Sequence, residues 1–165
     1  MRVLVIAVNR VEKLKKPLDH ADCEVSVLSP STELSVWRRY IQFLLILWKD
    51  MKKSDYDIII TRETGFVGAA AILVGRIHRV PVIPRIAGDK YKSYKFHFFN
   101  FASNNDIRGI FYITTKFLLF VFCMVMARSI IVVSKHLKNR YRLFGKWANQ
   151  NFIIIPVSVS CPPSS

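Results

Sequence analysis

Polar residues that could bind a ligand stand directly after several apolar runs of the sequence. Arg62 and Glu63 follow the run Asp57–Thr61, and Gly88 with Asp89 follow Val80–Ile86. If these runs are parallel strands, their carboxyl ends share one edge of a sheet, which is where open α/β sheets bind ligands. Basic side chains and helix N-termini at such an edge favour an anionic group. The candidate cleft residues are Asn9, Arg10, Arg62, Glu63, Gly65, Arg85, Gly88, Asp89, Ser134 and Lys135.

Each candidate also has an ordinary structural explanation. Arg62 and Glu63 are equally compatible with a solvated loop pair, and Ser134 is a good N-cap for a following helix. The stretch Arg85–Asp89 is the strongest candidate, because polar groups gather there directly after an apolar strand. The sequence assigns no catalytic residue.

Several common enzyme sites lack their defining motifs in this sequence. No G-x-G-x-x-G follows the first apolar run, and neither a P-loop nor a G-x-S-x-G element is present. No Cys/His cluster has zinc-ligand spacing, so we expect no bound metal. The three cysteines, Cys23, Cys123 and Cys161, do not form a disulfide framework, and the apolar N-terminus is too short for a signal peptide. We therefore expect a cytoplasmic protein.

The chain is apolar and strongly basic. Its 165 residues are 52% hydrophobic, which excludes a disordered chain. Lys and Arg number 25 against 11 Asp and Glu, for a formal charge of +14, and no acidic residue occurs from Ile107 to Ser165. Such a distribution is typical of proteins that meet phosphate in nucleic acid, in an anionic lipid surface or in a phosphorylated substrate. Nucleic acid is the least favoured of the three, because no recognition motif accompanies the charge.

Alternating strands and helices are predicted to position the candidate residues. Continuous apolar runs at the N-terminus and elsewhere are typical of strands buried on both faces of a parallel sheet. The pattern predicts an α/β fold with a three-layer, doubly wound, mostly parallel, Rossmann-like sheet over residues 1–156, followed by a linker or tail over 157–165. The predicted strands are Arg2–Val8, Glu24–Leu28, Asp57–Thr61, Val80–Ile86, Ser129–Ser134 and Asn151–Ile155. The predicted helices run from Ser31 to Lys53 and over Phe66–His78, Ile107–Ala127 and Lys135–Phe144.

Three local predictions accompany this scheme. Pro81 and Pro84 lack the N–H that a ladder needs, so Val80–Ile86 is expected to be an edge strand or to end early. Gly145 is expected at the C′ position that closes the last helix. The small residues Gly68–Ala71 are expected to let their helix approach the sheet closely.

Two segments admit more than one interpretation. Residues 88–106 show neither strand nor helix periodicity and are predicted to form a long, mobile connection. Their aromatic and lysine side chains are compatible with a docking surface or with a loop packed on the core. The segment Ile107–Ala127 is favoured as a core helix over an interfacial membrane helix. Its uninterrupted apolar stretch, Phe117–Ala127, is short of the ~20 residues that a membrane span needs.

Three stretches, by their order and spacing, carry a resemblance to a known family. They are DIIITRETGFVGAAAILVGRIHRVPVIPRIAGD, then ARSIIVVSKHLKNRYRLFG, then NFIIIPVSV. This order resembles the N-terminal Rossmann-like domain of GT-B glycosyltransferases, specifically the retaining enzymes of family 4, group 1. The resemblance covers Met1 to Ser160. It departs from the family pattern at Asn9-Arg10, where a glycine-rich turn is usual, and at Val157–Ser160, which replaces Asn-Gly-Val-Asp.

The resemblance implies that this chain is the acceptor-binding half of a retaining glycosyltransferase. Such an enzyme moves a sugar from a nucleotide-sugar to a glycan or lipid-linked acceptor. The nucleotide-sugar would be held by a C-terminal donor-binding domain or by a separate partner chain, so this chain alone is expected to bind no cofactor and to be inactive. An alternative is a non-catalytic basic α/β module that binds an anionic membrane surface or another protein. Either interpretation is compatible with peripheral attachment at the inner face of the cell membrane.

Overall fold

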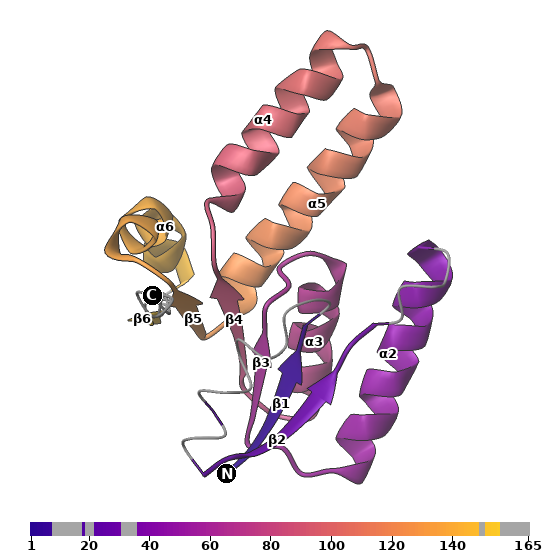
Figure 1. Cartoon of the computed structure of the whole chain (residues 1–165), viewed down its shortest axis with the longest axis vertical. Coiled ribbons are helices and arrows are strands. Elements are labelled where there is room, and N and C mark those ends of the chain that lie inside the picture. The colour runs from indigo at the N-terminus through magenta and orange to yellow at the C-terminus, as the bar shows by residue number, and fades with distance from the viewer. Residues whose placement is uncertain (8–17, 19–21, 31–35, 149–150, 156–165) are drawn as a thin grey trace, which may run out of the picture.

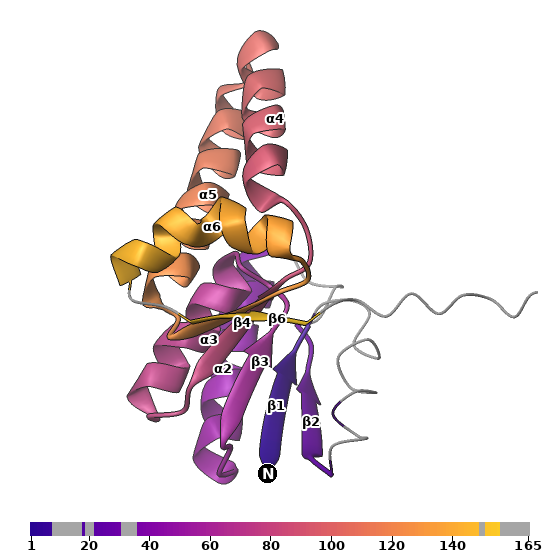
Figure 2. The same cartoon turned by 90° about the vertical axis from the view of Figure 1, so that its left-hand side faces the viewer.

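The computed structural model describes residues 1–7, 18, 22–30, 36–148 and 151–155. Six strands form one sheet in the order β2-β1-β3-β4-β5-β6, and every neighbouring pair is parallel (Figures 1 and 2). This sheet with its flanking helices is an α/β, Rossmann-like fold, which confirms the predicted fold class. The strands are β1 (Arg2–Ile6), β2 (Glu24–Leu28), β3 (Ile58–Thr61), β4 (Val82–Ile86), β5 (Ser129–Val132) and β6 (Asn151–Ile154).

The apolar runs form strands because both faces of the central strands are covered. In β1, Val3, Leu4, Val5 and Ile6 have no exposed surface. Leu4 and Ile6 belong to the main core with the helices, whereas Val3 and Val5 pack on the other face with Ile60. The alternation of side chains along a strand therefore divides one continuous apolar run between two cores.

Four helices cover one face of the sheet. They are α2 (Val36–Lys53), α3 (Phe66–Ile77), α5 (Ile107–Met126) and α6 (Lys135–Ala148), and each contacts the next. From β3 onward each connection steps in the same direction across the sheet, and right-handed crossovers then place their helices on the same face. The order reverses only between β1 and β2, and Leu18 and Cys23 of that connection pack on the opposite face. Because β2 and β3 lie on opposite sides of β1, the switch point of this doubly wound sheet lies between β1 and β3.

The small residues of α3 allow close packing, as predicted. Ala69, Ala70 and Ala71 are buried. A Cβ on Gly75 would collide with the Val82 side chain of β4, and a Cβ on Gly68 would collide with the backbone of Glu63. The helix therefore lies against the sheet and against the loop that precedes it.

The edge-strand prediction for Val80–Ile86 is wrong. Strand β4 is central, between β3 and β5. Its prolines are tolerated because of where the two ladders run: pairing with β3 covers Val82–Pro84, and pairing with β5 begins only at Arg85. Pro84 thus precedes the first β4–β5 pair, where its missing N–H removes little of the ladder.

The prediction of a mobile connection over residues 88–106 is also wrong. A helix, α4 (Lys90–Ser103), occupies most of it, and the side chain of Asp89 accepts a hydrogen bond from the Lys92 backbone N–H at 3.0 Å as its N-cap. No side chain of α4 is fully buried, so the helix lacks the apolar stripe that would have revealed its period. The predicted C′ glycine, Gly145, lies instead inside α6, which continues to Ala148.

Helices α4 and α5 form a hairpin that extends beyond the end of the sheet (Figures 1 and 2). Asp106 caps α5 by accepting a hydrogen bond from the Gly109 N–H at 2.9 Å, and Gly109 leaves no room for a Cβ beside the Phe101 ring. Residues 90–126 are called the α4–α5 hairpin below. Of the described helices, α5 alone is long and apolar enough to cross a membrane by length and composition.

Burial differs along α5, and the core-helix interpretation of Ile107–Ala127 applies to its C-terminal half. In its C-terminal half, Phe120, Cys123 and Met124 are fully buried against the main core. In its N-terminal half, Ile107 and Phe111 are among the most exposed apolar side chains of the described residues. The core therefore anchors one end of α5 and leaves the other end exposed.

Candidate functional site

The structure brings the candidate residues to one edge of the sheet. Because all six strands are parallel, Arg62 and Glu63 after β3, Arg85–Asp89 at the end of β4, and Ser134 with Lys135 after β5 lie at the same carboxyl edge. Asn9 and Arg10 lie outside the described residues. The placement agrees with the ligand-binding edge of open α/β sheets, and the contacts divide the candidates into three groups.

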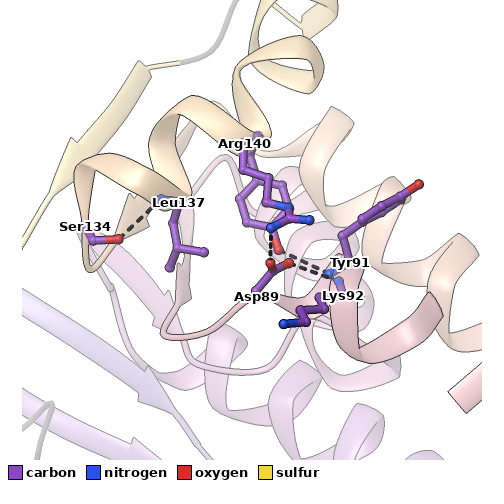
Figure 3. A network of polar contacts seen from close by, with 7 residues as sticks. Asp89, Tyr91, Lys92, Ser134, Leu137 and Arg140 are labelled. Carbon is purple, nitrogen blue, oxygen red and sulfur yellow. Dashed lines mark hydrogen bonds and ion pairs between the residues drawn. The ribbon is translucent and has the colours of Figure 1, made fainter. Parts of the chain in front are cut away.

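The first group holds α4 and α6 together. The Asp89 carboxylate forms an ion pair with the Arg140 guanidinium in addition to capping α4 (Figure 3). The Tyr91 N–H donates to the Tyr141 hydroxyl at 3.3 Å, and burial raises the pKa of that hydroxyl above its ordinary value. Asp89 is therefore a structural carboxylate at the junction of β4, α4 and α6.

Ser134 is the cap of α6, as its position after β5 predicts. Its hydroxyl oxygen accepts a hydrogen bond from the Leu137 N–H at 3.2 Å, which satisfies a backbone donor in the first turn (Figure 3). Lys135 beside it is exposed. The contacts of Ser134 support its structural role.

The second group is a pair of arginines at the ends of β3 and β4. Burial and the nearby Arg62 guanidinium both lower the pKa of Arg85 from its ordinary value. Strand alternation turns Arg85 away from the main core, because Pro84 and Ile86 on either side of it are buried. Two neighbouring, half-buried cations concentrate positive charge at this part of the edge, which favours an anion.

The third group, Glu63 with Gly65, lies at a cavity of about 640 Å³. The cavity is bordered by α2, the loop between β3 and α3, and the α4–α5 hairpin. Its described lining combines apolar side chains with three cations and a single carboxylate, that of Glu63. The lining residues are Pro30, Arg39, Tyr40, Glu63, Thr64, Gly65, Phe66, Val67, Lys90, Ser93, Tyr94, His97, Phe111, Tyr112, Ile113, Thr115, Lys116 and Leu119.

Hydrogen bonds in the loop after β3 position Glu63. The buried Thr61 hydroxyl accepts from the Glu63 N–H and donates to the Glu63 carbonyl, both at 3.2 Å. The Thr64 side chain hydrogen-bonds with Tyr94 of α4, which ties the hairpin to this loop. Burial raises the pKa of Tyr94 to about 12, so its hydroxyl stays protonated at neutral pH.

The cavity lining offers both apolar contact and positive charge. Phe66, Phe111 and Leu119 offer apolar contact, while Lys90 and Lys116 offer charge for an anionic group. Among the described residues no group of three metal-ligating side chains is close enough to hold a metal ion.

Sequence reasoning missed most of this cavity because it missed α4. Lys90, Ser93, Tyr94 and His97 recur at i, i+3, i+4 and i+7, which is one face of a helix, and all four line the cavity. That spacing was the available signal. The residues at this spacing are polar or aromatic rather than aliphatic, so they do not indicate the buried apolar face of a helix.

Comparisons with solved structures identify the fold. The chain matches UDP-GlcNAc 2-epimerase from Methanocaldococcus jannaschii over 94% of its own length and 45% of that chain, with a TM-score of 0.64 and 12% identity. It matches MnaA of S. aureus, in a structure with UDP, over 93% and 43%, with a TM-score of 0.63 and 14% identity. It also matches MurG of Acinetobacter baumannii over 96% and 46%, with a TM-score of 0.56 and 11% identity.

No family model and no curated protein sequence matches the chain. The identities to the solved structures are low, so the likeness concerns the fold, and the chain spans about half the length of the proteins that it matches. The parallel sheet, its flanking helices and these matches together establish a GT-B-like, Rossmann-type fold.

Proposed function

We propose that this chain is the acceptor-binding half of a retaining glycosyltransferase similar to family 4 of the GT-B enzymes. The observation that carries the proposal is the cavity at the carboxyl edge of the sheet, with its apolar walls, its cations and the Glu63 carboxylate. The sequence resemblance and the half-length structural matches support it. The retaining stereochemistry rests on the sequence resemblance.

The cavity residues have distinct roles in this proposal. Glu63 accepts a hydrogen bond from the acceptor hydroxyl and orients it, while Lys90 and Lys116 bind an anionic group of the acceptor. The apolar walls take an aliphatic part, so a lipid-linked acceptor with a phosphate group fits this chemistry. Arg62 and Arg85 add positive charge at the same edge of the sheet.

A nucleotide-sugar donor and a second domain complete the proposed site. Transfer from a nucleotide-sugar requires stabilisation of the departing diphosphate by preorganised donors and cations. In the proposal these groups come from a C-terminal donor-binding domain or from a separate chain. The chain by itself is then expected to bind an acceptor without turning it over.

A transfer assay tests the proposal. Labelled nucleotide-sugars and a lipid extract are incubated with the chain alone and with the chain joined to, or mixed with, a candidate donor-binding domain. We expect transfer only with both halves present. Glu63→Gln and Lys116→Gln should each lower the transfer rate by about tenfold or more.

Asp89→Asn is the matched control, because it removes a carboxylate that the contacts assign to structure. It should retain most of the activity if the protein stays folded. Transfer at the wild-type rate by the Glu63→Gln variant would remove the assignment of Glu63 to the site. Binding of a short isoprenyl phosphate to the chain alone, weakened by Lys116→Gln, would support the acceptor role independently of turnover.

A further inference from the structure

The α4–α5 hairpin exposes large apolar side chains on both of its helices. On α4, Phe96 is 68% exposed and Phe99 is 60% exposed; on α5, Ile107 is 79% exposed and Phe111 is 75% exposed. Tyr94 of α4 faces α5, where its ring packs on Phe117 and Phe120. Phe96 and Phe99 lie two and five residues beyond Tyr94, so the helical period turns them away from α5.

Basic side chains accompany this exposed apolar surface. The segment from 90 to 126 contains five Lys and Arg residues and one acidic residue, Asp106, whose carboxylate caps α5. Lys92 and Lys95 lie on the same helical stripe of α4 as Phe96 and Phe99, and the Lys95 ammonium sits 5.9 Å from the centre of the Phe99 ring. Phe side chains and lysines on one exposed stripe are the composition of helices that lie at a membrane–water interface.

The same composition argues against a protein partner. Lysine is depleted from protein–protein interfaces, whereas it gains energy at an anionic lipid surface. Lysines can pair with lipid phosphates while the neighbouring Phe side chains contact the acyl chains. This stripe therefore fits an anionic membrane surface better than it fits a folded protein surface.

Polar residues limit how deeply the hairpin can enter a bilayer. Its turn consists of Asn104, Asn105 and Asp106, all exposed, and Lys116 interrupts the middle of α5. The C-terminal half of α5 is held in the protein core by Phe120 and Met124. These constraints favour a position at the headgroup level, with only the Phe side chains reaching the acyl chains.

We propose that the α4–α5 hairpin docks this protein on an anionic membrane surface through the stripe formed by Lys92, Lys95, Phe96 and Phe99. The proposal does not depend on the glycosyltransferase function, because none of these four residues lines the candidate cavity. The cavity residues of α4, which are Lys90, Ser93, Tyr94 and His97, lie on the opposite face of that helix from the stripe.

Vesicle sedimentation of the full chain tests the docking surface. The vesicles are phosphatidylcholine alone or phosphatidylcholine mixed with phosphatidylglycerol, each at low and at high salt. The wild-type chain should bind the anionic vesicles in a salt-sensitive way. Lys92→Gln/Lys95→Gln should weaken that binding by about 30-fold, and Phe96→Ser/Phe99→Ser by at least about tenfold.

Matched variants separate a specific surface from general stickiness of a basic chain. Lys138→Gln/Arg142→Gln removes the same charge from exposed positions on α6, and Ile77→Ser removes an apolar side chain that is 64% exposed on α3. Both controls should bind within about threefold of wild type. Equal losses for the hairpin and control variants would overturn the proposal, as would wild type that ignores anionic vesicles.

Two further measurements keep the result interpretable. Thermal unfolding followed by circular dichroism confirms that each variant is folded, and single substitutions at Phe96 or Phe99 replace the pair if the double variant is not. Light scattering during size-exclusion chromatography measures the mass in solution. A dimer that Phe96→Ser/Phe99→Ser dissociates, without any change in vesicle binding, would assign the stripe to a second copy of the chain and contradict membrane docking.

Discussion

At the scale of single residues, position and contacts assign different roles to the same side chain. By its place after β4, Asp89 is a candidate ligand-binding carboxylate, yet it caps α4 and pairs with Arg140. Glu63 is two residues past the end of β3 and lines the cavity. Both carboxylates lie at the same edge of the sheet, and only their local hydrogen bonds distinguish a structural carboxylate from an available one.

The capping role of Asp89 predicts an ordered pair of stability effects. Asp89→Ala should lower the free energy of unfolding by ~1–2 kcal/mol, because it removes a helix N-cap and a partly exposed ion pair. Asp89→Asn keeps a good N-cap residue, so it should lower the free energy of unfolding by less than half of the amount expected for Asp89→Ala. Urea unfolding measures both, with Asp106→Ala as the control that removes a cap without that ion pair. Equal losses for the Asn and Ala variants would show that the ion pair dominates.

The partly buried Tyr94 hydroxyl predicts a loss of stability at alkaline pH. Burial raises the pKa of Tyr94 from 10.0 to about 12, so above pH 10 the unfolded chain releases this proton more readily than the folded one. The contribution of Tyr94 to the stability of the fold is complete below pH 10 and disappears as the pH rises through 12. Thermal midpoints measured from pH 8 upward should fall above pH 10, and less steeply in Tyr94→Phe. An identical slope in the two proteins would contradict the burial of this hydroxyl.

At the scale of elements, α3 is positioned by close backbone packing. A Cβ on Gly68 would collide with the backbone of Glu63 and would lie 3.3 Å from the Cys123 sulfur of α5. This contact holds the cavity loop between the first turn of α3 and the buried half of α5. The geometry of the site therefore depends on a residue that has no side chain.

Gly68→Ala should destabilise the protein by ~1–3 kcal/mol, the usual effect of overpacking. Gly88→Ala is the control, because a Cβ at Gly88 meets nothing within 4 Å and should change stability little. Chemical denaturation measures both variants. A near-neutral Gly68→Ala would mean that the Glu63 backbone moves aside readily, and the cavity loop would then be softer than its hydrogen bonds suggest.

At the scale of the whole molecule, uneven charge is the dominant electrostatic feature. A formal charge of +14 on 165 residues makes the folded chain repel itself. The same charge attracts anionic partners, whether a lipid surface or the phosphate of a substrate. The positive charge thus strengthens the binding of anionic partners and lowers the stability of the fold.

Self-repulsion predicts that added salt stabilises the protein. The thermal midpoint should rise between low and moderate NaCl concentration, because screening shortens the range of the repulsion. Lys138→Gln/Arg142→Gln, which reduces the charge on α6, should show a smaller rise. If sucrose and NaCl raise the midpoint equally in both proteins, the gain comes from excluded solute rather than from screened charge.

The sequence by itself determined the alternation of strands and helices, and with it the parallel sheet and the edge where polar residues gather. These features follow from local periodicity, which a single chain carries in its own pattern of apolar residues. The central place of β4 was not determined by the sequence. Pro81 and Pro84 are compatible with an edge strand, and also with a central strand whose ladder hydrogen bonds do not need the two missing N–H groups. Helix α4 was not recognised either, because no side chain on it is fully buried.

Only the tertiary structure decided which polar residues share a cavity. Glu63, Lys90 and Lys116 line one cavity because the α4–α5 hairpin folds beside the loop after β3, and these residues are separated by tens of positions in the chain. The hairpin in turn is held at its base by the Asp89–Arg140 pair and by the buried half of α5. Contacts between distant segments depend on how whole elements pack, and no local pattern of residue types records that packing.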